Sequence, residues 1–137
     1  MLCLYGGNND AMALVYTFDP QSKTWSTPNI AGVTPAKKKS FLTGVRDNNG
    51  KMYLFGGIEF TGNNTSTNLN DMVILDTINL SWGIGSIVGA SIPRYSYGAV
   101  MLPNQNIIYL GKQAIAIIKV LGLFIYFCFL KYLFRRL

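Results

Sequence analysis

The stretch Leu4-Tyr5-Gly6-Gly7 returns fifty residues later in the chain as Leu54-Phe55-Gly56-Gly57. A second pattern repeats with it: an aspartate that is followed six residues later by a tryptophan, first at Asp19 and again at Asp76. Two copies of both patterns in the same order indicate a chain that is built from repeats of about 50 residues. A unit of this size cannot bury its own faces, so the sequence predicts a fold that depends on stacked neighbours.

The local patterns predict β-structure. Leu2–Tyr5 and Met52–Phe55 are apolar at every position, which is typical of a strand that is covered on both faces. The run Phe41–Val45 predicts a strand before the second of these, joined to it by a hairpin turn of type I′ at Asn49-Gly50. Each repeated aspartate is expected to accept hydrogen bonds from turn amides, and each tryptophan to cover apolar area at the edge of its repeat.

A third repeat begins and then breaks. Residues 93–102 predict a strand and 107–111 the next one, but Lys112 stands where a second glycine is expected. Residues 114–134 are apolar except for Lys119 and Lys131, and this length is about what a helix needs to cross a membrane. We therefore expect 112–137 to be a hydrophobic α-helix with a basic end, of a length suited to a transmembrane helix. Whether it is a membrane anchor or out-of-frame sequence is left open by the pattern.

Charge and composition exclude several function classes. Residues 1–111 carry seven Lys/Arg and six Asp/Glu, whereas 112–137 carry five basic residues and no acidic one. The basic balance therefore belongs to the apolar tail, which disfavours nucleic-acid binding. Cys3 and Cys128 form no disulfide or zinc pattern. The chain has no histidine, the commonest base and metal ligand at neutral pH, so we expect no catalytic residue, no metal and no cofactor.

Residues 1–111 resemble the kelch-repeat β-propellers, within the galactose-oxidase-like and attractin/muskelin-like groupings. The start Pro93-Arg94 also fits this pattern. The matching motif residues, which the resemblance implies are structural, are Gly6, Gly7, Asp19, Trp25, Gly56, Gly57, Asp76, Trp82 and Gly111. The implied fold is mainly β: an incomplete kelch β-propeller of antiparallel strands, with two blades and part of a third, followed by the C-terminal hydrophobic α-helix. We place blade A at 1–34, blade B at 35–92 and partial blade C at 93–111.

The resemblance implies a noncatalytic protein-interaction module, and we interpret the chain as a fragment, because a ring needs ~4–8 blades. Galactose oxidase itself is a copper enzyme with histidine ligands, and no residue here can take that part. The Lys37-Lys38-Lys39 run is expected on a solvated loop. By their match to contact positions in such propellers, the candidate partner-binding residues are Asn8, Asn9, Lys37, Lys38, Ile58, Glu59, Arg94 and Tyr95.

An alternative from another class is a membrane-anchored structural or surface protein that is held by residues 114–134. The expected location is accordingly a membrane, or alternatively the cytoplasm. Glycosylation sequons begin at Asn63, Asn64 and Asn79, and they matter only if this part is lumenal. Fewer than about three stacked repeats leave faces and strand edges bare, so we expect isolated 1–111 to oligomerise or aggregate.

Overall fold

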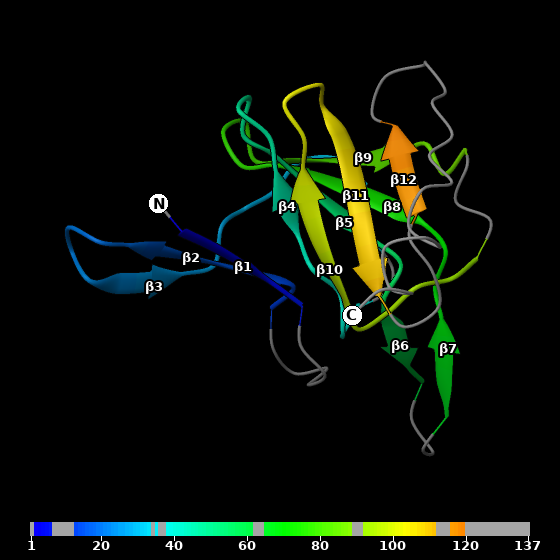
Figure 1. Cartoon of the computed structure of the whole chain (residues 1–137). Helices are drawn as coiled ribbons and strands as arrows, with labels where there is room; N and C mark the ends of the chain where they lie inside the picture. Colours follow the sequence, from blue (N-terminus) through cyan, green and yellow to red (C-terminus); the bar gives the residue numbers. More distant parts are fainter. Residues whose placement is uncertain are drawn as a thin grey trace, which may run out of the picture.

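The structure, a computed structural model, describes residues 2–6, 13–33, 35, 38–61, 65–88, 92–111 and 116–119. Over these ranges the chain forms β-strands and turns, and no helix (Figure 1). The strands in chain order are β1 (Leu2–Tyr5), β2 (Val15–Asp19), β3 (Thr24–Ser26), β4 (Val45–Arg46), β5 (Lys51–Phe55), β6 (Ile58–Phe60), β7 (Ser66–Asn68), β8 (Met72–Asp76), β9 (Ser81–Gly85), β10 (Tyr97–Met101), β11 (Asn106–Gly111) and β12 (Ala116–Lys119).

The strands form three larger sheets and one hairpin. Sheet A has the strand order β1-β2-β3, sheet B the order β4-β5-β8-β9 and sheet C the order β10-β11-β12, and every pairing within them is antiparallel. Sheet B contacts both others: β10 runs beside β4, and the Tyr5 ring of sheet A stands edge-on to Trp82 of sheet B at 6.1 Å. The predicted mainly β, antiparallel architecture is confirmed.

The β6–β7 hairpin extends from the end of the molecule that lies lowest in Figure 1. It occupies the polar segment between the double glycine and β8, and it pairs Ile58 with Asn68 and Phe60 with Ser66. The main-chain amide of Thr61 donates to the carbonyl of Thr65 at 3.1 Å beyond the last pair. The second repeat therefore carries a two-stranded projection that is separate from sheet B.

The repeated aspartates accept the hydrogen bonds that the sequence predicts. Asp19 accepts from the amide of Gln21 at 3.0 Å and from the hydroxyl of Ser22 at 2.8 Å, and Asp76 accepts from the amide of Asn79 at 2.8 Å. These bonds, chiefly that of Ser22 for Asp19 and that of Asn79 for Asp76, lower the pKa of both carboxyls. The two turns are therefore built in the same way.

The turn between β4 and β5 differs from the predicted type. A type I′ turn needs a positive φ at both central residues, but only Gly50 has one, at 82°, and Asn49 does not. The amide of Gly50 donates to the carbonyl of Asp47 at 3.2 Å, and that of Asp47 donates to Lys51 at 2.9 Å. The prediction of a hairpin is right and its type wrong: the loop has three residues, with the glycine at its bulge.

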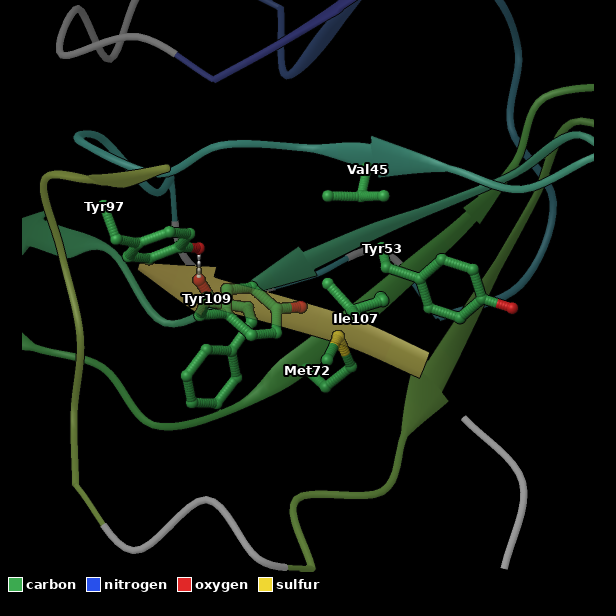
Figure 2. Packing of buried hydrophobic residues seen from close by; sticks show 7 residues of the cluster. Val45, Tyr53, Met72, Tyr97, Ile107 and Tyr109 are labelled. Atoms are coloured by element: carbon green, nitrogen blue, oxygen red, sulfur yellow. Dashed lines mark hydrogen bonds between the residues drawn. The ribbon is translucent and has the colours of Figure 1, made fainter. Parts of the chain in front are cut away.

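An apolar core lies between sheets B and C (Figure 2). The Tyr109 ring packs 5.2 Å from that of Phe55 and 5.1 Å from that of Tyr97, and the Tyr97 hydroxyl donates to the Phe55 carbonyl. Burial raises the pKa of both tyrosines above its ordinary value. The buried members of the cluster are Val45, Tyr53, Phe55, Met72, Tyr97, Ile107 and Tyr109.

Glycines bring the chain of one repeat against the start of the next. At Gly6 a Cβ would lie 2.7 Å from the carbonyl oxygen of Lys39, and at Gly56 a Cβ would lie 2.5 Å from that of Arg94. Both glycines have a positive φ, of 94° and 59°. Because a Cβ has no room at either position, the close approach needs glycine. The contacts also show that Lys39 and Arg94 hold equivalent places in successive repeats.

The predicted C-terminal helix is wrong where the structure describes its segment. Ala116–Lys119 forms strand β12, which pairs antiparallel with β11, so that Ile108 lies opposite Ile117. A short apolar run suits a buried strand as well as a helix, and the available edge of β11 decides between them. Sheet C therefore continues beyond residue 111. The remainder of the predicted helix, 112–115 and 120–137, lies outside the described residues, within which no helix could span a membrane.

We predict that Gly56→Ala destabilises the protein by about 3 kcal/mol, because the new methyl group meets the Arg94 carbonyl and the positive φ is strained for alanine. Gly98→Ala is the matched control, since its nearest atom, the Leu110 carbonyl oxygen, is 3.8 Å away. Urea unfolding followed by tryptophan fluorescence measures both variants. Equal midpoints for the two would show that the junction at Gly56 does not need glycine.

Candidate functional site

Four segments meet at the end of the molecule from which the β6–β7 hairpin extends (Figure 1). The first is the β6–β7 hairpin itself. Residues 38–42 lead into sheet B, 92–96 lead into sheet C, and Gly56-Gly57 connects β5 to the hairpin. Main-chain bonds join them: Gly57 donates to Arg94 at 2.7 Å, and Ser40 and Ile58 exchange two bonds of 2.9 and 2.8 Å. Surface residues on these segments therefore have backbone positions that are held by long-range hydrogen bonds.

Three aromatic side chains from three of these segments are exposed. Phe41, Phe60 and Tyr95 are 58%, 45% and 44% exposed, and we call them the aromatic surface. The rings of Phe41 and Phe60 lie 6.1 Å apart with an interplanar angle of 58°, within the range of aromatic pairing. The amide of Ser96, next to Tyr95, donates to the Phe41 carbonyl at 2.7 Å. The fold thus exposes large rings to solvent on a backbone that is held by main-chain hydrogen bonds.

Phe41 was expected inside a strand, and that expectation is wrong. Its φ is 58°, a region that side chains other than glycine seldom adopt, so the strand starts only at Val45. Ser96, which follows Arg94 by the same two residues that separate Phe41 from Lys39, has a φ of 49°. This backbone shape is therefore a repeated feature of the junction between sheets, whereas the exposed phenylalanine is found at one of the two.

Lys39, two residues before Phe41, is the structure's main departure from the expected solvated lysine run. Its side chain is fully buried, and its Nζ is 2.8 Å from Oδ1 of Asp71, which is 52% exposed. The ammonium also donates to the carbonyls of Leu54 at 3.4 Å and Asp71 at 3.3 Å. Burial lowers the pKa of Lys39, and the hydrogen bond and charge of Asp71 oppose that change. The lysine therefore links sheet B to the segment that leads into it.

The predicted partner-binding residues fall into two groups. Ile58, Glu59 and Arg94 are half-buried beside the aromatic surface, as is Lys38, and Tyr95 belongs to it. Asn8, Asn9 and Lys37 lie outside the described residues, as do the sequon residues Asn63 and Asn64. The third sequon residue, Asn79, is exposed and donates to Asp76 at 2.9 Å. Sequence reasoning missed Phe41 and Phe60, although an apolar Phe60 within a polar segment was a usable signal.

A groove and the carboxylate and thiol side chains were the other candidates for a binding site. A groove of about 220 Å³ lies between sheets A and B, lined by residues 13–15 and 27–30 and by Trp82. It touches none of the predicted candidates. Among the residues that the structure describes, no three carboxylate or thiol side chains gather closely enough to hold a metal ion. The aromatic surface is the arrangement that best supports recognition of another molecule.

Comparison with known proteins gives consistent matches. The family model described as the KLHDC2/KLHL20/DRC7 Kelch-repeats domain matches residues 1–120. The chain is 34% identical over 114 residues to Kelch domain-containing protein 3 of Rattus norvegicus and of Mus musculus, and 32% identical over 114 residues to that of Homo sapiens. Each alignment covers 80% of this chain and 28% of the relative. The chain therefore spans a little over a quarter of the length of these relatives.

We predict that Asp71→Asn destabilises the protein by about 2 kcal/mol, because it leaves the buried Lys39 ammonium without its charge partner. The half exposure of Asp71 keeps this below the cost of breaking a fully buried pair. Lys39→Met should cost less, and adding Asp71→Asn to Lys39→Met should cost almost nothing further. Denaturant unfolding of the four proteins measures the coupling; additive effects would contradict a functional ion pair.

A pH dependence follows from the lowered pKa of Lys39. Between that lowered value and the ordinary 10.5, the unfolded chain binds more protons at this lysine than the folded chain does. The contribution of Lys39 to stability therefore rises with pH across this window. Subtracting the unfolding free energy of Lys39→Met from that of the wild type at each pH isolates the effect from the tyrosines. A difference that stays flat or falls would contradict the lowered pKa.

Proposed function

The chain belongs to the kelch-repeat family, and from that premise we propose that it is a noncatalytic protein-interaction module whose partner binds at the aromatic surface of Phe41, Phe60 and Tyr95. Kelch-repeat domains are associated with protein binding, which gives the general function. The position of the site and the division into blades 1–34, 35–92 and 93–111 are the finer parts of the proposal.

The observation that supports this site is the exposure of three large rings on segments whose backbone is held by main-chain hydrogen bonds. Exposure of apolar area to water costs free energy, and this free energy is recovered when a partner covers the area. Aromatic residues are enriched among the few that dominate binding energy at protein interfaces. Phe41, Phe60 and Tyr95 come from segments that are joined by main-chain hydrogen bonds. The backbone therefore loses little conformational freedom when a partner binds.

Polar residues beside the rings supply the rim of the proposed site. Lys38, Glu59 and Arg94 carry both signs of charge and are half-buried, so their side chains are already partly placed. Rim charges act mainly on the rate of association and on the choice of partner. We extend the rim to Asn8, Asn9 and Lys37 on their match to kelch contact positions. Ile58, the first residue of the hairpin, adds apolar area.

We predict that a photo-crosslinking phenylalanine analogue at position 60, in the full chain, captures a defined set of proteins from cell extract. The same analogue at Ile84, which is 86% exposed on β9, is the control and should not capture that set. Phe41→Ala or Tyr95→Ala should then weaken binding of a captured, purified partner by about 30-fold, the equivalent of a hot-spot residue. Equal capture at positions 60 and 84 would remove the aromatic surface from the proposal.

The rim is tested with the same purified partner. Arg94→Ala and Lys38→Ala should slow association and reduce its dependence on salt, while dissociation changes little. Surface plasmon resonance at two salt concentrations separates the two rates. Unchanged affinity and rates in both variants would confine the site to the aromatic rings.

A further inference from the structure

The β6–β7 hairpin has one strand, β7, whose outer side carries no neighbouring strand. Ser66, Thr67 and Asn68, which form β7, are all exposed to solvent. Strand β6 pairs with one side of β7, and within the residues that the structure describes no strand or isolated bridge pairs with the other side. We call that side the open edge of β7. The hairpin projects beyond the end of sheet B (Figure 1), so the face-to-face stacking of the sheets does not cover this edge.

The hydrogen bonds show which main-chain groups of β7 point out of the open edge. Ile58 of β6 exchanges two main-chain bonds with Ser40, of 2.8 and 2.9 Å, so its amide and carbonyl point away from Asn68, which lies opposite it on β7. In an antiparallel ladder, pairs that are joined by main-chain hydrogen bonds alternate with pairs that are not. Thr67 therefore bonds to β6, whereas Ser66 and Asn68 direct their amides and carbonyls outward.

One face of the hairpin continues into the aromatic surface. Opposite residues of an antiparallel pair point to the same side, so Phe60 shares this face with Ser66, and Ile58 shares it with Asn68. The Phe41 ring, 6.1 Å from that of Phe60, extends the apolar area. A strand added at the open edge would lie about 10 Å from β6, which is twice the spacing of neighbouring strands. Because Ser66 is small, a large side chain opposite it can reach Phe60.

We propose that the protein partner of the aromatic surface binds through an extended segment, which adds to the open edge of β7 as a further strand. The outward amides and carbonyls of Ser66 and Asn68 bond to the main chain of this segment. Every second side chain of the segment is large and apolar and packs toward Phe60. The inference rests on the proposed function, because it specifies how a partner engages that site.

The chemistry of the edge favours an extended peptide segment as the occupant. Outward donors and acceptors at every second residue match the main chain of another strand, whose own amides and carbonyls repeat at the same spacing. Natural edge strands commonly prevent such pairing with a lysine, a proline or a bulge, and Ser66–Asn68 has no lysine or proline and pairs with β6 in unbroken register. Strand pairing supplies affinity that does not depend on sequence, and the adjacent rings supply selectivity for apolar side chains.

The test uses the full 137-residue chain and, as the probe, a phage-displayed library of linear peptides. Selection on the chain should yield peptides with large apolar residues at every second position. Asn68→Pro removes one outward amide and keeps the bonds of Thr67 to β6, so it should weaken a selected peptide by about tenfold. Asn68→Ala is the matched control: it loses the same side chain but keeps the amide, and its affinity should stay close to that of the wild type.

Amide hydrogen exchange, followed by nuclear magnetic resonance, tests the geometry of the edge directly. In the free chain the amides of Ser66 and Asn68 should exchange faster than that of Thr67, which is bonded within the hairpin. A bound peptide should slow both fast amides and change Thr67 little, a pattern that contact with side chains alone would not produce. The same measurement on Asn68→Pro shows whether the hairpin persists, and Ser66→Pro replaces that variant if it does not.

Strand addition is overturned if no such peptide is selected, if the proline variant with an intact hairpin binds as tightly as the wild type, or if the bound peptide leaves the amides of Ser66 and Asn68 fast. Phe41→Ala and Tyr95→Ala distinguish this failure from failure of the proposed function. Affinity that falls in these two variants but not in Asn68→Pro would keep the aromatic surface and remove the added strand. The opposite result would keep the added strand and remove the rings from the proposed site.

Discussion

The strictest steric constraint in this protein is the close approach of the main chain at a glycine to the first residues of the following repeat. A side chain at Gly6 or Gly56 would overlap the carbonyl of Lys39 or Arg94, and Gly57 donates a 2.7 Å hydrogen bond to Arg94. Because each sheet is placed by its contact with the preceding repeat, the position of sheet C depends on this junction. The shared core of Phe55, Tyr97 and Tyr109 lies between the two sheets that this junction joins.

The same junction produces the candidate site. It holds residues 38–42 against the start of the β6–β7 hairpin and against residues 92–96, so that rings from distant parts of the chain face solvent together. The ion pair between the buried Lys39 and the half-exposed Asp71 joins residues that are 32 positions apart. A buried charge of this kind contributes less net stability than its geometry suggests, because desolvation offsets the attraction.

Stacking also decides which apolar surfaces of the sheets are covered. In sheet B both faces are covered by neighbours within the chain: Leu54 and Leu75 are fully buried on one side, and Tyr53 and Phe55 lie in the core shared with sheet C on the other. The aromatic surface lies at the end of the stack, on residues that belong to neither face.

The sequence by itself determined the repeat, the strands that flank it and the aspartate turns, because these depend on short-range patterns: continuous apolar runs, glycines with a positive φ and carboxylates beside turn amides. It could not determine that Lys39 is buried, since this depends on Asp71 and on the backbone of a neighbouring strand. Nor could it show that Phe41 faces solvent or that Ala116–Lys119 pairs with β11. Those features were decided by tertiary structure, because an apolar residue takes its environment from the segments that pack beside it.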